Sequence, residues 1–174
     1  MSGAEDGAPQ GRFQASRLAA GHDLTGFDCG DSALNDWLAR LSRRMDEQDI
    51  ARVYVWTRVG AAAVVAYFSV SPTLVLGEQM PRATAGGNSQ IPGYLLARFA
   101  LDLALQGQGL GRQLLLSALE AIVAASAASS GRLIVVDPAD GAASFYAKYG
   151  FRATGTGHRM FMKVATARQA LRVQ

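Results

Sequence analysis

A short glycine-rich stretch is the part of the sequence best suited to chemistry. It runs from Gln106 to Arg112 (QGQGLGR) between an apolar run and a long helical pattern. Glycines at a strand-to-helix turn let the backbone approach a ligand closely, and the first N–H groups of the helix bind anions such as a pyrophosphate. No Gly-Lys-Ser/Thr follows, and the third glycine position counted from Gly107 falls on Arg112, which disfavours P-loop and Rossmann interpretations. The stretch predicts a phosphate-binding turn, with an ordinary structural turn as the alternative.

A second candidate is an aromatic cluster near the C-terminal end. Phe145 and Tyr149 are four residues apart on one predicted helical face and are expected in the core, whereas Tyr146 points about 100° away. A phenol with an ordinary pKa of about 10 is protonated at neutral pH and can donate a proton. Tyr146 can therefore act as an acid, and the alternative is an ordinary core or surface aromatic side chain.

Other reactive side chains have weaker contexts. Cys29 is the single cysteine and has no matched histidine and acid, so it is a poor nucleophile candidate. His22 and His158 are expected to be surface or packing residues. No group of residues has the spacing of metal ligands, and no general base is apparent.

The elements that position these residues follow from apolar periodicity. Helices are predicted over Asp31–Met45, Leu110–Ala128 and Asp140–Tyr149. Strands are predicted over Val53–Arg58, Ala61–Val70, Tyr94–Leu103, Leu133–Val136, Phe151–Thr154 and Met160–Val164, with an irregular loop over Pro81–Pro92.

Size and composition limit the class of protein. The chain has 174 residues, of which 49% are hydrophobic and 18% charged, as expected for one folded domain. No apolar run reaches the ~20 residues of a membrane span, and one cysteine indicates a reducing compartment, so a cytoplasmic protein is expected. The predicted organisation is a loose tail (1–12), one domain (13–165) and a basic C-terminal tail (166–174).

Charge is distributed unevenly along the chain. Residues 1–50 carry 9 acids and 5 bases, whereas residues 51–174 carry 5 acids and 12 bases. Arginine supplies 15 of the 17 bases, and its planar guanidinium suits phosphate recognition. An anionic partner is one interpretation of this pattern, and a solvated surface is the other.

Two motifs resemble the GNAT acetyltransferase superfamily. Gln106-x-x-Gly109-x-Gly111 is similar to its pyrophosphate signature, and Ala143–Phe151 (ASFYAKYGF) looks like its helix-to-strand corner. Phe27–Leu38 (FDCGDSALNDWL) and Leu96–Asp102 (LARFALD) are similar to the GNAT toxins of type II toxin–antitoxin systems, which acetylate aminoacyl-tRNA. The resemblance implies an α/β (α+β) GNAT fold, with a mixed, mostly antiparallel sheet splayed in the middle and flanked by helices.

The resemblance also implies roles for individual residues. Acetyl-CoA would be bound by the main chain of Phe99, Ala100 and Leu101, and its pyrophosphate by the amides of Gln106, Gly107, Gln108, Gly109, Leu110, Gly111 and Arg112. Tyr146 would protonate the departing thiolate, and no metal is expected. Candidate tRNA contacts are Arg40, Arg43, Arg44, Arg52 and Arg98, with Lys148, Arg152 and Arg159 further along the chain.

Arg98 interrupts an apolar strand, where a charge is costly unless it faces a site or is paired, for example with Asp102 or Asp137.

The expected partners are aminoacyl-tRNA, a ribbon-helix-helix antitoxin and a second copy of the chain. Three alternatives stay open: acetylation of a small amine or a protein N-terminus, an acyl-CoA-binding module without catalysis, and a nucleic-acid-binding module without chemistry, for which the sequence shows the charge but no known DNA-reading motif.

Overall fold

The computed structural model describes residues 12–173, so the predicted loose tail lies almost entirely outside the described residues. The strands are β1 (Phe13–Arg17), β2 (Arg52–Arg58), β3 (Val64–Leu76), β4 (Gln90–Leu101), β5 (Leu133–Val136), β6 (Arg152–Ala153) and β7 (Met160–Lys163). The α-helices are α1 (Ser32–Arg40), α2 (Ser42–Glu47), α3 (Arg82–Ala85), α4 (Leu110–Ala125), α5 (Ala143–Lys148) and α6 (Val164–Arg172). Two short 3-10 helices are η1 (Gly77–Gln79) and η2 (Leu103–Leu105).

The strands form one mixed sheet in the order β1-β2-β3-β4-β5-β7-β6. β4 and β5 are parallel, with Gly93 opposite Leu133 and Leu96 opposite Val136. The pairs β1–β2, β2–β3, β5–β7 and β6–β7 are antiparallel. The predicted fold class, a mixed and mostly antiparallel sheet with flanking helices, is confirmed.

The chain forms two compact units that share the long strands β3 and β4 and helix α4. Unit 1 combines the described residues up to Val70 with Arg98–Leu119. Unit 2 combines Ser71–Ala97 with the described residues from Glu120 onward. Each unit has its own hydrophobic core.

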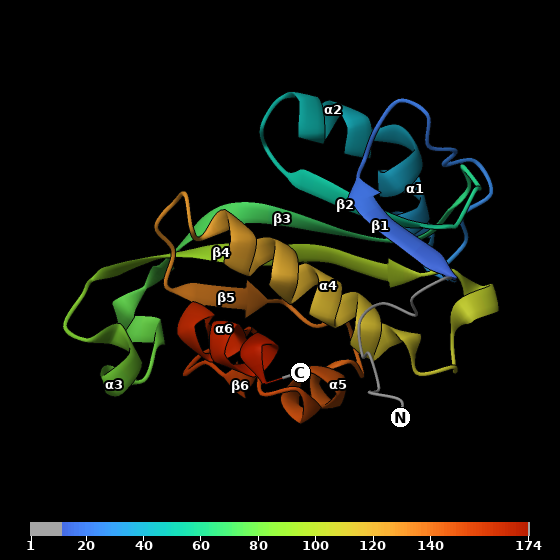
Figure 1. The fold of residues 1–174 in the computed structure, drawn as a ribbon. Coiled ribbons are helices and arrows are strands. Elements are labelled where there is room, and N and C mark those ends of the chain that lie inside the picture. Colours follow the sequence, from blue (N-terminus) through green and yellow to red (C-terminus); the bar gives the residue numbers. More distant parts are fainter. Residues whose placement is uncertain (1–11, 174) are drawn as a thin grey trace. The chain divides into compact units, whose positions relative to one another are not determined.

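The core of unit 1 lies between α1 and strands β2 and β3. The Asp31 carboxylate caps α1 by accepting hydrogen bonds from the amides of Ala33 and Leu34. One turn further on, Leu38 is fully buried against a cluster that includes Val53, Val55 and Tyr67. Figure 1 shows α1 and α2 together beside β2.

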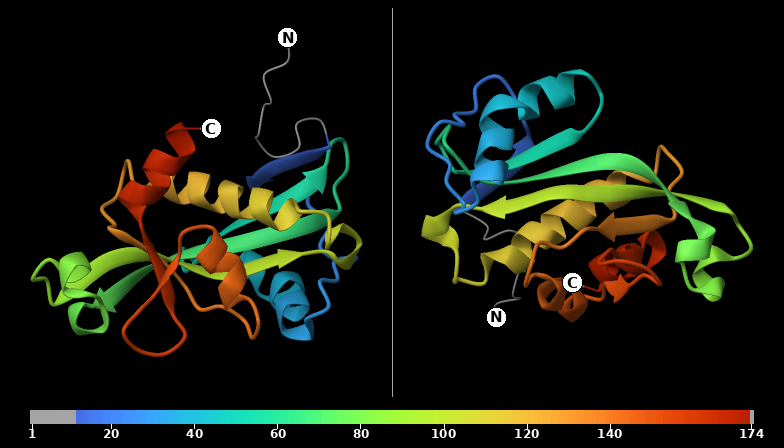
Figure 2. Two further views of the ribbon diagram at one scale, coloured as in Figure 1. Left: turned by 90° about the horizontal axis from the view of Figure 1, so that it is seen from below. Right: turned by 180° about the vertical axis from the view of Figure 1, so that it is seen from behind.

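The core of unit 2 is built around β5, whose four residues are all buried. Leu133 and Val135 pack with Ile91 of β4, Phe161 of β7 and Val75 of β3. Figure 2 shows α3 and its neighbouring turns at the end of the ribbon that β3 and β4 form. A strand buried on both faces is typical of the centre of a sheet covered by helices.

Among the predicted elements whose bounds differ in the structure, three differ most. The helix predicted over Asp31–Met45 is two helices, because the φ angle at Leu41 is −115°, far from the about −63° of a regular helix, and the Ser42 hydroxyl donates to the Leu38 carbonyl, a bond that bends helices. The strand predicted to end at Val70 continues to Leu76. The loop predicted over Pro81–Pro92 contains α3 and the start of β4.

Besides α3 and the two 3-10 helices, β1 and α6 were not predicted. The edge strand β1 buries only Phe13 among its five residues, so its apolar pattern is weak. The predicted C-terminal tail (166–174) is wrong for Thr166–Arg172, because these residues belong to α6, which buries Val164 and Ala167. Among residues 12–173, no helix is long and apolar enough to cross a membrane.

Candidate functional site

The glycine-rich turn of unit 1 has a geometry that suits a phosphate ligand. Gly107 and Gly109 have φ angles of +74° and +76°, in the left-handed region that favours glycine. A Cβ atom built on either residue would meet no atom within 4 Å, so both backbones border open space. Helix α4 begins directly afterwards at Leu110, and the first N–H groups of a helix lack intrahelical acceptors. The residues present therefore fit a bound diphosphate.

The Gln106 side chain holds this turn in place. Its Nε2 atom donates to the carbonyl oxygens of Cys29 and Leu101, each at 2.9 Å. Its backbone N–H donates to the Leu103 carbonyl at 3.3 Å, within the turn that closes η2. Among the residues predicted to bind pyrophosphate, Gln106 thus has a positioning role in this structure.

A second loop, Asp28–Asp31, supports the same turn. The Asp28 carboxylate accepts hydrogen bonds from the Gly30 amide and the Asn35 side chain, both at 2.9 Å, and these bonds lower its pKa. The Asp28 amide donates to the Asp102 carboxylate at 3.1 Å, and the Asp28 carbonyl accepts from the Leu103 amide at 2.8 Å. Asp28, Asn35 and Asp102 are positioning residues that the site prediction omitted, although the motif Phe27–Leu38 contains two of them.

The strand segment Phe99–Leu101 lies at the end of β4, immediately before this turn. The parallel pairing of β4 with β5 ends at Leu96, opposite Val136, while β4 continues to Leu101. Ala100 is buried, and Phe99 and Leu101 are half-buried. Unit 1 therefore brings together the two segments predicted to bind acetyl-CoA, the strand end and the glycine-rich turn.

Tyr146 belongs to unit 2 and lies on α5. Its side chain is 5% exposed and makes edge-to-face contacts with the rings of Phe145 and Phe151, with centroids 5.2 and 5.6 Å apart. Burial raises the pKa of Tyr146 to about 12, so the phenol is protonated at neutral pH. Phe145 and Tyr149, predicted as core, are only half-buried, so that prediction is wrong and Tyr146 is the buried member of the three.

Two of the predicted RNA-contacting arginines have structural partners within unit 1. Arg43 donates to the carbonyl oxygens of Ala19 at 2.7 Å and His22 at 2.6 Å. Arg52 forms an ion pair with Asp49 and lies 3.6 Å from the Asp46 carboxylate. These contacts fix the guanidinium of Arg43 against the segment between β1 and α1, and that of Arg52 against the turn after α2.

The other three predicted RNA-contacting arginines differ in how exposed their side chains are. Arg40 is exposed on α1, with its Nε atom 4.0 Å from the Asp36 carboxylate, and Arg44 is exposed on α2. Arg98 on β4 is half-buried and its guanidinium lies over the Trp37 ring, 5.2 Å from the centroid. That cation–π contact stabilises the charge inside the apolar strand.

The remaining titratable groups have local roles. The His22 ring accepts a hydrogen bond from the Ala19 amide at 2.9 Å, and burial raises the pKa of the Cys29 thiol, which disfavours the thiolate. Arg159, a further RNA candidate, binds the Asp137 carboxylate through two atoms at 2.7 and 2.8 Å. Within the described part of the chain, no group of three or more His, Cys, Asp or Glu side chains could hold a metal ion.

The fold and the glycine-rich turn define a class of acyl-CoA-dependent transferases, and comparison with known proteins agrees. The model of the acetyltransferase (GNAT) domain family matches residues 46–162. The chain belongs to the GNAT acetyltransferase family.

Relatives with a described activity share this fold. The tRNA-acetylating toxin of Mycobacterium tuberculosis is 30% identical over 142 residues, which cover 80% of this chain and 84% of that protein. The structure of AtaT complexed with acetyl-methionyl-tRNAfMet is 26% identical, with a TM-score of 0.84 over 91% of this chain and 99% of AtaT. A tyrosine-to-phenylalanine variant of AtaT, bound to acetyl-CoA and the C-terminus of the antitoxin AtaR, is 26% identical, with a TM-score of 0.78 over 92% of this chain and 98% of AtaT.

Proposed function

We propose that this acetyltransferase is the toxin of a toxin–antitoxin pair and that it acetylates the amino group of aminoacyl-tRNA, which blocks translation. The observation that carries this proposal is the 30% identity to a tRNA-acetylating toxin over most of both chains. The 26% identity to AtaT, whose complex contains acetyl-methionyl-tRNAfMet, supports the same acceptor.

The acetyl donor is acetyl-CoA, which supplies an activated thioester when bound. In this chain the main chain of Phe99–Leu101 orients the pantetheine arm, and the backbone N–H groups from Gly107 to Arg112 bind the pyrophosphate. The left-handed glycines bordering open space support this assignment, since a side chain there would occupy the ligand's position. Gln106 and Asp28 act through the turn that they hold.

The amine of the aminoacyl ester attacks the thioester carbonyl, the C–N bond forms, and the C–S bond breaks to release the thiolate of CoA. Tyr146 donates the proton that this thiolate takes up. A phenol whose pKa is raised to about 12 keeps its proton at neutral pH, as a general acid must. The amine of an aminoacyl ester has a lower pKa than a lysine side chain, so water can accept its proton.

The RNA partner is expected to contact arginine side chains of unit 1. Arg40 and Arg44, exposed on consecutive helices, and Arg98 beside Trp37 are the proposed contacts; the guanidinium groups of Arg43 and Arg52 add charge from more fixed positions. Restraint by a ribbon-helix-helix antitoxin, a homodimeric state and a cytoplasmic location complete the proposal. The complex of AtaT with the C-terminus of AtaR supports an antitoxin.

Mass spectrometry of a charged tRNA pool tests the proposal. The pool is incubated with acetyl-CoA and either the wild type, Tyr146→Phe or Tyr149→Phe, and the terminal adenosines are analysed after nuclease digestion. We expect N-acetylated aminoacyl-adenosine from the wild type, at least a hundredfold less from Tyr146→Phe and near wild-type amounts from Tyr149→Phe. Tyr149 is the matched control because it directly follows the same helix, at its C-cap position, and is half-buried.

A parallel measurement of acetyl-CoA affinity separates the outcomes. Unchanged affinity in Tyr146→Phe with loss of product supports a role in proton transfer. If the wild type acetylates small amines or protein N-termini but no charged tRNA, the acceptor assignment is wrong. If it binds acetyl-CoA and acetylates nothing, the chain is an acyl-CoA-binding module.

A further inference from the structure

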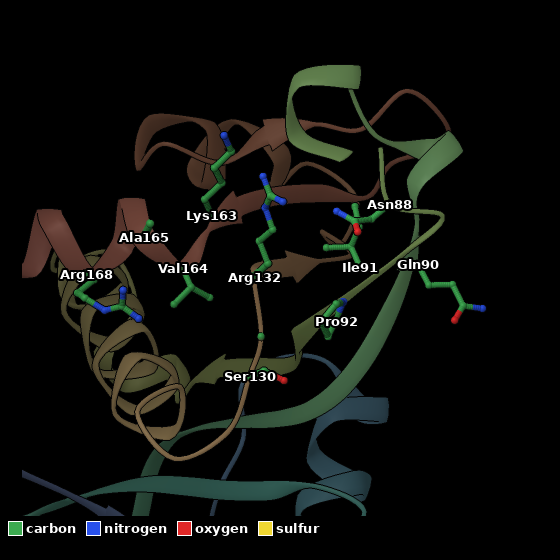
Figure 3. A pocket seen from close by; sticks show the side chains of 11 residues that line it. Asn88, Gln90, Ile91, Pro92, Ser130, Arg132, Lys163, Val164, Ala165 and Arg168 are labelled. Carbon is green, nitrogen blue, oxygen red and sulfur yellow. The ribbon is translucent and has the colours of Figure 1, made fainter. Parts of the chain in front are cut away.

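A cavity lies within unit 2 and shares no residue with the glycine-rich turn. Its volume is about 500 Å³, within the range of small-molecule sites. The start of β4, the turn before β5, the end of β7 and the first turns of α6 form its walls, as Figure 3 shows.

Three cationic side chains line this cavity: Arg132, Lys163 and Arg168. Arg132 immediately precedes β5, and Lys163 is paired with the next residue, Leu133, so their side chains start from adjacent strands. In Figure 3 these two side chains extend in the same direction. Neighbouring like charges repel each other, and an anion bound beside them would remove that repulsion.

No carboxylate compensates these charges. The lining contains no Asp or Glu, and none of the three cations forms an ion pair with another residue in the range 12–173. Elsewhere in the chain, Arg17, Arg52 and Arg159 are each paired with a carboxylate within 2.7 Å. Among the described residues, the three cations make one side-chain hydrogen bond, from Arg168 to the Ser126 hydroxyl at 3.2 Å, which leaves the charge in place.

The start of α6 adds to the positive potential. Val164 and Ala165, the first two residues of this helix, line the cavity, and no side chain caps the helix at Lys163. The first turn contains no acidic residue. The positive end of the helix dipole therefore reinforces the three cations.

The rest of the lining suits a larger ligand than a bare phosphate. Asn88, Gln90 and Ser130 supply hydrogen-bond donors and acceptors, and the exposed ring of Pro92 supplies an apolar wall. Cations for a phosphate, amides for a base edge and an apolar wall for a base face match the parts of one nucleotide.

We propose that this cavity binds a nucleoside phosphate, either as a free nucleotide or as one unit of an RNA strand. Arg132 and Lys163 hold the phosphate, Arg168 adds charge, and the base lies toward Pro92. The proposal concerns binding alone and does not depend on which amine the enzyme acetylates.

Titration of the full chain by NMR tests this site. The probe is uridine 5′-monophosphate, added at low ionic strength in the presence of saturating acetyl-CoA, so that the cofactor site is occupied. We expect saturable shifts of the amides of Gly131, Arg132 and Val164–Thr166. Arg132→Gln should weaken binding at least tenfold, whereas Arg172→Gln, an equal loss of charge at an exposed position of α6 outside the cavity, should leave the affinity within twofold.

A uridine hexanucleotide in a second titration distinguishes the two sources. Shifts at the same amides with the mononucleotide, or with the hexanucleotide alone, uphold the proposal and assign the ligand to a free nucleotide or an RNA strand. If neither probe shifts these amides, or if Arg172→Gln weakens binding as much as Arg132→Gln, the proposal is wrong. Lys163→Gln is a second variant for the same comparison if Arg132→Gln does not give a folded spectrum.

Discussion

Replacement of Gly109 by alanine separates backbone strain from ligand binding. Gly109 has a φ angle of +76°, and an added Cβ would meet no atom within 4 Å, so the folded chain would lose stability through backbone conformation alone. A left-handed conformation costs an L-residue about 1–2 kcal/mol, and the stiffer unfolded chain returns about 0.4–1 kcal/mol. The expected net loss is about 1 kcal/mol of unfolding free energy, or about 2–4 °C in Tm for a chain of this size.

Gly60 provides a matched control for this substitution. It lies in the turn between β2 and β3 with a φ angle of +78° and the same open surroundings for a Cβ. Gly60→Ala and Gly109→Ala should therefore lower Tm by similar amounts in differential scanning fluorimetry.

Only one of the two variants should bind acetyl-CoA poorly. A methyl group at Gly109 would occupy space beside the helix start, where we place the pyrophosphate, so we expect the Kd measured by calorimetry to rise at least tenfold. In Gly60→Ala the Kd should equal that of the wild type. Equal affinities in both variants would refute the assignment of the glycine-rich turn, and a Tm loss several times larger in Gly109→Ala would refute the argument from backbone strain.

Three further perturbations test the described contacts. Burial raises the pKa of Tyr146 from 10.0 to about 12, so the stability gained from the neutral phenol is complete below pH 10 and is lost as pH rises toward 12. Urea unfolding between pH 10 and pH 12 should therefore show a decline in the free energy of unfolding, and Tyr146→Phe should reduce that decline. The hydrogen bonds from Arg159 lower the pKa of Asp137 below 3.8, so this partly exposed pair stabilises the fold above that pH and loses its contribution on acidification. In thermal unfolding, Asp137→Asn should lower the free energy of unfolding by about 0.5 kcal/mol at pH 7 and leave it unchanged at pH 2. Leu38 is 0% exposed, and Leu38→Ala should cost about 2–5 kcal/mol in denaturant unfolding; a loss under 1 kcal/mol would contradict the packing of α1.

The sequence predicted the elements whose signals are local. The apolar spacing around Leu114 and Leu119 and the glycines before Leu110 place α4 and its start without reference to the rest of the chain. The strand β5 is a continuous run of Leu, Ile and Val, and the structure has the same bounds as the prediction.

Elements that depend on tertiary packing were missed or misplaced. Helix α6 buries only Val164 and Ala167 on its apolar side, and its many charged and polar residues resemble a tail in the sequence. The break at Leu41 has no glycine or proline to mark it. The roles of Arg43 and Arg52 depend on carbonyl and carboxylate groups that folding brings near them, so residue type alone indicated only their charge.

The positioning of the glycine-rich turn explains why two separated motifs belong together. Asp28 and Cys29, more than 70 residues before the turn, accept hydrogen bonds through their carbonyls from Leu103 and from the Gln106 side chain. The Asp28–Cys29 segment supplies the acceptor carbonyls and the Leu103–Gln106 segment supplies the donors, so neither segment can form this connection alone. A change in the Asp28–Asp31 loop should therefore weaken acetyl-CoA binding without touching the ligand, because it releases the turn whose amides must be fixed in advance to bind an anion.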